Sequence, residues 1–92
     1  MKLEWDEAKN VVNIEKHGID FNDAGELFQG NRLIIPDVRK DYGEERFISV
    51  GRIKTRLMIA IYTQRSAGTI RIISLRKAND REKERFEKAV KN

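Results

Sequence analysis

The sequence contains no cysteine, a single histidine and a single proline. Without cysteine the chain has no disulfide framework, no thiol nucleophile and no thiolate metal site. One histidine, His17, excludes metal sites that are built from several imidazoles. We therefore expect a protein that uses neither a metal ion nor another cofactor.

Long hydrophobic runs are also missing. No apolar run approaches the roughly 20 residues that a membrane-spanning helix requires, and the first residues show no signal-peptide pattern. Shorter apolar segments remain, enough for one modest core in a chain of 92 residues. From this we expect one cytoplasmic domain over residues 1–92, with no membrane association.

Charged residues make up 37% of the chain, and their signs are unevenly distributed. Residues 1–45 carry 6 Lys and Arg against 11 Asp and Glu, whereas residues 46–92 carry 13 against 4. This distribution predicts a basic surface in the second half, suited to a polyanion such as nucleic acid. The alternative is a solvated surface of mixed charge, with ion pairs between the arginines and the acidic helices.

Residues 1–30 predict two amphipathic helices. Asp6 is placed to cap the first, and Gly18 ends it in a left-handed conformation. We expect this helix to bury an apolar stripe of Ala8, Val11, Val12 and Ile14. Its polar side chains are expected to face elsewhere, namely Lys9, Asn10, Asn13 and Lys16. The second helix begins after Asp20 and ends at Gly30.

Sheet patterns follow these helices. Strands are predicted at residues 32–37, 46–52, 56–63 and 70–75, and residues 3–5 alternate as in a brief strand. Pro36 cannot donate to a ladder and favours an edge or a strand end. A last helix begins after Asn79, which can form a capping box with Glu82. The predicted fold is α+β: two N-terminal helices on a small, mainly antiparallel sheet of about four strands, with a C-terminal helix.

Several polar residues suit cleavage of a phosphodiester without a metal ion. That reaction needs a base, an acid and cations for the charged transition state, and RNA supplies its own 2′-hydroxyl nucleophile. The candidate cations are Arg46, Arg52, Arg71, Arg76 and Lys77. The candidate proton carriers are His17, Glu44, Glu45 and Tyr62.

Each proton carrier also has a purely structural interpretation. His17 fits a capping role at the end of a helix, and Tyr62 fits core packing with its hydroxyl at the rim. The two glutamates fit a solvated loop. The residues by themselves therefore indicate a basic α+β domain that binds nucleic acid, and they leave its activity open.

Several segments, in order along the chain, add a family resemblance. They are Glu4-Trp5-Asp6-x-x-Lys9-x-x-x-Asn13-x-x-Lys16-His17-Gly18-Ile19-x-Phe21-x-x-Ala24, Gly43-Glu44-Glu45-Arg46, Gly51-Arg52, Tyr62-Thr63 and Arg71-Ile72-Ile73-Ser74-x-Arg76-Lys77-Ala78. Together they resemble the BrnT family of bacterial toxins over nearly the whole chain. Asp20 stands where Ser or a similar cap is expected, a change that a helix N-cap tolerates.

The resemblance implies a type II toxin, a small endoribonuclease of RelE-like fold that blocks translation by cutting RNA. It also implies a cognate BrnA-like antitoxin with a ribbon-helix-helix DNA-binding domain. The complex of the two would bind its own operator DNA and repress transcription.

We therefore predict a metal-independent endoribonuclease toxin. The residues predicted to be catalytic are His17, Glu45, Tyr62, Arg76 and Lys77, and those predicted to bind RNA phosphate are Arg46, Arg52 and Arg71. The first alternative is a non-catalytic nucleic-acid-binding module or co-repressor that acts only with a partner protein. A further alternative is an interaction protein whose basic surface meets an acidic partner.

Overall fold

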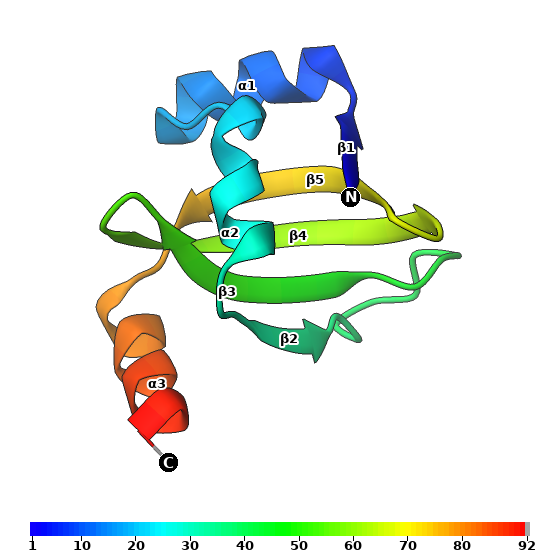
Figure 1. The fold of residues 1–92 in the computed structure, drawn as a ribbon. Coiled ribbons are helices and arrows are strands. Elements are labelled where there is room, and N and C mark those ends of the chain that lie inside the picture. Colours follow the sequence, from blue (N-terminus) through cyan, green and yellow to red (C-terminus); the bar gives the residue numbers. More distant parts are fainter. Residues whose placement is uncertain (92) are drawn as a thin grey trace.

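A mixed sheet forms the centre of the computed structural model, which describes residues 1–91 and leaves Asn92 of the expected domain outside the described residues. The strands are β1 (Lys2–Trp5), β2 (Leu33–Pro36), β3 (Phe47–Ile53), β4 (Arg56–Ser66) and β5 (Thr69–Lys77). They lie side by side in the order β1-β5-β4-β3-β2 (Figure 1). β1 runs parallel to β5, and the other neighbours are antiparallel.

The expected sheet of about four strands is corrected to five within residues 1–91, and it is mixed. The additional strand is the short N-terminal segment, in which Leu3 pairs with Ile70 and Trp5 with Ile72. Parallel strands require a long connection. Here the chain forms β2, β3 and β4 after β1 and before β5, the strand with which β1 pairs. Local sequence patterns therefore carry no signal for this pairing.

The meander of β3, β4 and β5 follows the prediction. β4 lies at the centre of the sheet, consistent with its nearly continuous apolar sequence. Pro36 is the last residue of β2, which lies at an edge where a missing backbone N–H is tolerated.

The helices are α1 (Glu7–His17), the 3₁₀ helix η1 (Phe21–Ala24), α2 (Gly25–Gln29) and α3 (Asp80–Lys91). The Asp6 carboxylate accepts hydrogen bonds from the N–H groups of Ala8 and Lys9, and Gly18 is left-handed with φ 69°. The second predicted helix is instead η1 followed by the short α2. Its first part contains Asn22, Asp23 and Gly25, which are poor helix formers, and the chain there takes the tighter turn.

α1 presents the opposite face from the one predicted. Asn10 and Asn13 are buried, with 3% and 5% exposure, whereas Val11 and Val12 are 54% and 50% exposed. The Asn13 amide donates to the carbonyl oxygens of Ile19 (3.0 Å) and Leu75 (2.8 Å). Its oxygen accepts the Leu75 N–H at 3.2 Å. Because β1 pairs with β5 only as far as Ile72, Asn13 takes the place of a strand partner for Leu75.

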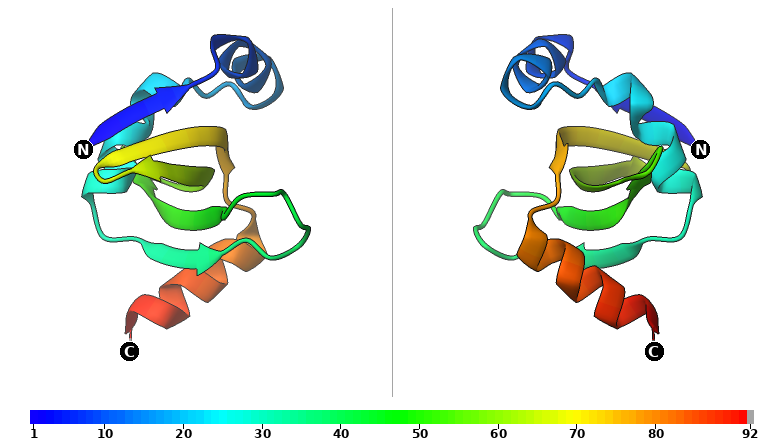
Figure 2. Two further views of the ribbon diagram at one scale, coloured as in Figure 1. Left: turned by 90° about the vertical axis from the view of Figure 1, so that its right-hand side faces the viewer. Right: turned by 90° about the vertical axis from the view of Figure 1, so that its left-hand side faces the viewer.

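Two apolar clusters lie on the two faces of the sheet. The larger cluster packs beneath η1 and α2 and includes Phe21, Leu27, Phe28, Met58, Ala60, Tyr62, Ile72 and Leu75. The smaller cluster packs beneath α3 and comprises Val50, Leu57, Ile59, Ala78 and Phe86. Figure 2 shows α2 on one side of the sheet, and α3 beginning on the other side and running beneath the β2 end.

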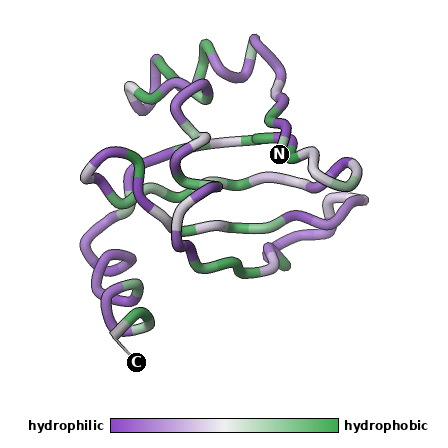
Figure 3. The backbone as a smooth tube through the Cα atoms, viewed as in Figure 1, coloured by the Kyte–Doolittle hydropathy of each residue, from purple (hydrophilic) through white to green (hydrophobic). Residues whose placement is uncertain are grey.

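α3 covers only part of its side of the sheet. Most of its length is hydrophilic (Figure 3), and Phe86 is its one buried residue among positions 80–90. We call the uncovered remainder of this side the open face. α1 and the loop of residues 37–46 both project beyond the sheet on that side (Figure 2). No helix within residues 1–91 is long and apolar enough to cross a membrane.

Candidate functional site

The register of the strands arranges the side chains on the α3 side of the sheet in rows, of which the first two, with Arg76 of the third, belong to the open face. The first, the polar row, comprises Glu4, Arg71, Thr63 and, one position beyond the last β3 pair, Arg46. The second, the isoleucine row, comprises Ser74, Ile61, Ile48 and Ile35. The third comprises Arg76, Ile59, Val50 and Leu33, the last three of which contribute to the cluster beneath α3.

A β-bulge in β5 brings the two arginines of that strand to the same face. The pairing shifts between Ile61 and Tyr62, so that β5 contains one additional residue, Ile73. Arg71 therefore pairs with Thr63 and Arg76 with Ile59, on one face, although five positions separate the two arginines. Strict alternation would place them on opposite faces.

Arg71 is held by a carboxylate and remains accessible. Its Nη1 donates to Glu4 Oε2 at 2.7 Å, and its side chain is 31% exposed. The guanidinium has five N–H donors, of which this contact uses one. Arg71 can therefore bind an anion without releasing Glu4.

Arg76 forms a two-pronged pair with Glu82 at the start of α3. The nitrogen–oxygen distances are 2.9 and 2.8 Å, and Arg76 Nη1 also donates to the carbonyl oxygen of Lys77 at 3.2 Å. Glu82 also accepts the Asn79 N–H, and Asn79 Oδ1 accepts the Glu82 N–H, which completes the predicted capping box.

The Arg76–Glu82 pair favours charge on both groups. The hydrogen bonds from Arg76 lower the pKa of Glu82, and Glu82 in turn raises the pKa of Arg76. Arg39 lies near enough to oppose this effect on Arg76. The side chain of Arg76 is 36% exposed, so its charge faces solvent at the open face.

The loop of residues 37–46 adds further polar groups. The Asp37 carboxylate is buried and accepts from Arg39 Nε at 2.7 Å and from Arg39 Nη2 at 2.9 Å. These bonds hold the pKa of Asp37 at about 2. Arg46 stacks on the Tyr42 ring at 4.0 Å and pairs with Glu44 at 3.3 Å.

His17 and Glu45 lie at the margin of the open face. The exposed His17, at the end of α1, lines a shallow pocket of about 340 Å³ together with Lys16, Ile73 and Ser74. Ser74 also belongs to the isoleucine row, so the pocket adjoins the open face. Glu45 is exposed, and its carbonyl oxygen accepts a 2.6 Å bond from Thr63 Oγ1, which fixes its backbone beside the polar row.

Tyr62 lies on the other face of the sheet. It is 3% exposed in the larger core, its hydroxyl is 2.7 Å from Ser49 Oγ, and its ring contacts those of Phe28 and Phe47. This position does not support the predicted catalytic role. Because Tyr62 pairs with Ile72, it points away from the face that carries Arg71.

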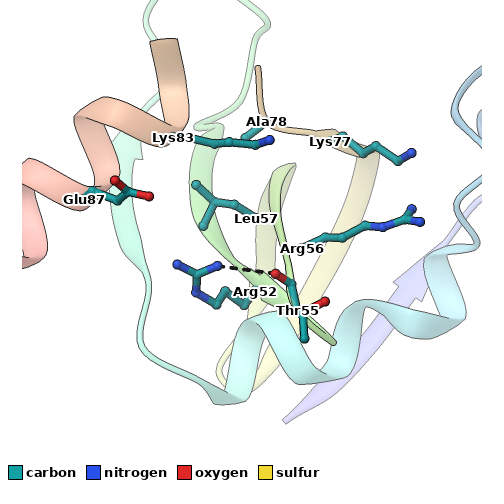
Figure 4. A pocket seen from close by; sticks show the side chains of 8 residues that line it. All are labelled: Arg52, Thr55, Arg56, Leu57, Lys77, Ala78, Lys83 and Glu87. Carbon is teal, nitrogen blue, oxygen red and sulfur yellow. Dashed lines mark hydrogen bonds between the residues drawn. The ribbon is translucent and has the colours of Figure 1, made fainter. Parts of the chain in front are cut away.

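Arg52 and Lys77 occupy a separate site. They line a pocket of about 430 Å³ between the β3–β4 turn and α3, together with Arg56 and Lys83 (Figure 4). We call this site the turn pocket. The structure thus divides the predicted set: Arg46, Arg71, Arg76, Glu45 and His17 surround the open face, and Arg52 and Lys77 do not.

Three further residues of these sites, Arg39, Arg56 and Glu82, were not predicted from the sequence. Glu82 was identified only as a cap, because its pairing with Arg76 depends on where α3 begins relative to β5. Arg39 and Arg56 lie in segments without a motif. Within residues 1–91, no group of three or more His, Asp or Glu side chains is gathered closely enough to hold a metal ion.

Comparison with known proteins gives a consistent assignment. Residues 5–82 match the family described as the ribonuclease toxin, BrnT, of type II toxin–antitoxin systems. The chain is also similar to the crystal structure of the Brucella abortus ribonuclease toxin BrnT, with 29% sequence identity and a TM-score of 0.73, over 87% of this chain and 99% of that one. The search of curated proteins gives no match. With a family match over most of its length and a shared fold, the chain belongs to the BrnT family of ribonuclease toxins of type II toxin–antitoxin systems.

Proposed function

We propose that this chain is a metal-independent endoribonuclease that binds RNA on the open face and cuts it by attack of a 2′-hydroxyl. The observation that carries the proposal is the convergence of Arg46, Arg71 and Arg76 on one accessible face of the sheet. Arginine offers two parallel N–H groups to a phosphate, and the transition state of cleavage carries more negative charge than the substrate.

The carboxylates beside these arginines support this role. Glu4 and Glu82 fix the side chains of Arg71 and Arg76, so that less conformational freedom is lost when a phosphate binds. Fixed donors stabilise developing charge without reorganising during the reaction. The isoleucine row between the two arginines offers apolar contact to a nucleobase.

For proton transfer we propose His17 and Glu45. Imidazole is the commonest general acid or base in enzymes, and His17 is exposed beside Ser74. Glu45 lies at the opposite margin, next to Arg46 of the polar row. We assign no proton-transfer role to Tyr62, because its hydroxyl lies in the core and is hydrogen-bonded to Ser49.

The proposal extends to the cellular role. A type II toxin has a protein antitoxin, and we propose that the partner of this chain is BrnA-like, with a ribbon-helix-helix domain through which the complex binds operator DNA. Free toxin would inhibit translation by cutting RNA. The chain would act in the cytoplasm, where its RNA substrates are.

Induced expression in a bacterial host tests the proposal, with growth and total RNA integrity followed over time. We expect arrest with RNA decay from the wild-type chain, reversed by co-expression of the antitoxin. Arg71→Gln and Arg76→Gln should relieve arrest, because each removes a phosphate contact. Arg81→Gln, a matched loss of charge at an exposed position of α3, should arrest growth like wild type.

Circular dichroism checks that each variant is folded. Undiminished toxicity of folded Arg71→Gln and Arg76→Gln proteins would remove the open face from the mechanism. Normal growth with intact RNA, from soluble and folded wild-type protein, would instead favour the non-catalytic binding module. That module would bind RNA with steep salt dependence and without cleavage.

A further inference from the structure

The turn pocket is a concentration of positive charge away from the open face. Four cationic side chains line it, Arg52, Arg56, Lys77 and Lys83, and the acidic side chain among its lining residues is Glu87. They come from four elements: the end of β3, the adjacent ends of β4 and β5, and the first turns of α3. Figure 4 shows Arg56 and Lys77 extending side by side from neighbouring strands.

Few acidic side chains neutralise the cations of this pocket. Within residues 1–91, Arg56 and Lys77 form no ion pair, and Lys83 is 3.8 Å from the exposed Asp80. Arg52 contacts the Thr55 carbonyl oxygen at 3.5 Å and the Phe86 ring at 5.8 Å. Arg71 and Arg76 differ, because a carboxylate holds each of them. An anion in the turn pocket would relieve repulsion among like charges.

The backbone holds this cluster in place. Lys54, in the turn, has φ 58°, a region that Gly, Asn or Asp usually occupies. Its N–H donates to Glu26 Oε2 of α2 at 2.9 Å, which ties the turn to the helix. Lys77 pairs with Met58, and Arg56 lies two residues before Met58, so the strand register sets a diagonal neighbour relationship between the two cations.

The pocket lies around the end of the sheet from Arg76 of the open face. Arg76 and Lys77 are consecutive on β5, so their side chains leave the strand on opposite faces, and Lys77 pairs with Met58 of the larger core. On α3 the consecutive Glu82 and Lys83 contact Arg76 and line the pocket, respectively. Arg71 and Lys77 are six residues apart on the strand, so they are separated by about 20 Å. That separation is longer than one nucleotide.

We propose that the turn pocket binds a phosphate of the RNA strand that flanks the phosphate held on the open face. The inference rests on the proposed function, because it assigns a second contact to the same substrate. Basic side chains that follow the path of the backbone are a common means of binding single-stranded nucleic acid, and here that path would run from the open face around the end of the sheet. The fully buried core of a protein–protein interface is more apolar than the rest of the surface, whereas this pocket offers only Leu57 and Ala78 as apolar side chains.

Binding of a non-cleavable RNA tests the inference. The probe is a fluorescein-labelled, single-stranded RNA of about twelve nucleotides, long enough to span both sites, with 2′-O-methyl groups throughout to prevent attack. Arg56→Gln should weaken its binding about two- to fivefold, as expected of one exposed charge contact. It should also reduce the slope of log K against log salt by about 0.7, the change expected for one lost phosphate contact.

Two controls sharpen this test. Arg81→Gln removes the same charge from α3 outside the pocket and should leave affinity and slope near wild type. A labelled 2′-O-methyl trinucleotide is too short to span the roughly 20 Å from Arg71 to Lys77, so Arg56→Gln should weaken its binding less than it weakens binding of the longer RNA. Arg56→Gln should also cleave a short substrate with unchanged kcat.

Several results would overturn the inference. Equal affinity and slope for wild type and Arg56→Gln with the longer RNA would exclude the pocket as an RNA site. Equal losses for the longer RNA and the trinucleotide would make the pocket part of the principal site instead. Weaker antitoxin binding with unchanged RNA binding would assign it to the protein partner. If wild type neither binds the longer RNA nor degrades RNA in cells, the proposed function fails together with the inference.

Discussion

Tyr62 and Thr63 are consecutive residues of β4, and their side chains point to opposite faces of the sheet. Thr63 lies in the polar row opposite Arg71, whereas Tyr62 packs among Phe28 and Phe47. A tyrosine near the end of a predicted strand can point either into the core or toward the open face. The side that faces substrate depends on which face the helices cover, and local sequence does not contain that information.

Tyr62→Phe separates the structural role of this residue from the catalytic one. The substitution removes the hydroxyl that contacts Ser49 and leaves the buried Ser49 hydroxyl without that partner. We expect a loss of about 1 kcal/mol in the free energy of unfolding, with RNA cleavage at the wild-type rate. Urea unfolding and a cleavage assay measure the two quantities. A folded variant with greatly reduced kcat would return Tyr62 to the catalytic set.

The arginines of the open face illustrate what residue identity could and could not predict. Arg71 and Arg76 were expected to contact phosphate because arginine suits that ligand and because they lie close in sequence. Their common face depends on the bulge at Ile73, which no composition rule indicates. Their carboxylate partners, Glu4 and Glu82, come from the opposite ends of the chain.

At the scale of elements, α1 shows a buried polar surface and an exposed apolar one. Asn10 and Asn13 are three residues apart and share a face, as do apolar residues in an ordinary amphipathic helix. Hydrophobicity rules assign such a face to solvent. The bonds that make it favourable reach Phe21 and Leu75, and Leu75 lies 62 residues away in the chain. The end signals at Asp6 and Gly18 are local and were therefore predictable.

A pair of substitutions in α1 distinguishes the two faces. Asn13→Ala removes three hydrogen bonds and leaves the Leu75 backbone without its partner, so we expect a loss of about 2 kcal/mol in the free energy of unfolding. Val12→Ala, at a position 50% exposed, should change that free energy by less than about 0.5 kcal/mol. Chemical denaturation of both variants measures the difference. A larger loss for Val12→Ala than for Asn13→Ala would contradict the observed orientation of the helix.

The sheet was predictable where its sequence signals are local. The residues of β3 alternate between apolar and polar, those of β4 are nearly all apolar over its first half, and short connections between strands predict a meander. The pairing of β1 with β5 joins the first residues to residues near 70, and it adds the fifth strand. The second predicted helix contains too many weak helix formers to remain one regular element, and it divides into η1 and α2.

Across the whole molecule, the unequal distribution of charge becomes a structural asymmetry. One alternative from the sequence was that ion pairs with the acidic helices neutralise the cations of residues 46–92. Instead, Arg71 pairs with β1 and Arg76 with α3, and Arg56 and Lys77 form no ion pair within residues 1–91. Cations of the second half therefore remain accessible on the open face, at Arg71 and Arg76, and around the end of the sheet in the turn pocket.

Whether this charge alone supports catalysis is a question for the whole enzyme with its substrate. Mg²⁺ binds through as few as one or two carboxylates together with substrate phosphates, so a protein needs no preformed three-ligand site to use it. If arginines stabilise the transition state, as we propose, cleavage of a defined RNA should proceed at an unchanged rate in excess EDTA. A substrate with a single 2′-deoxy sugar at the cleaved position should resist cleavage, because its nucleophile is missing. Loss of activity in EDTA that added Mg²⁺ restores would refute the metal-free mechanism, and cleavage of the 2′-deoxy substrate would show that water, rather than the neighbouring hydroxyl, attacks the phosphate.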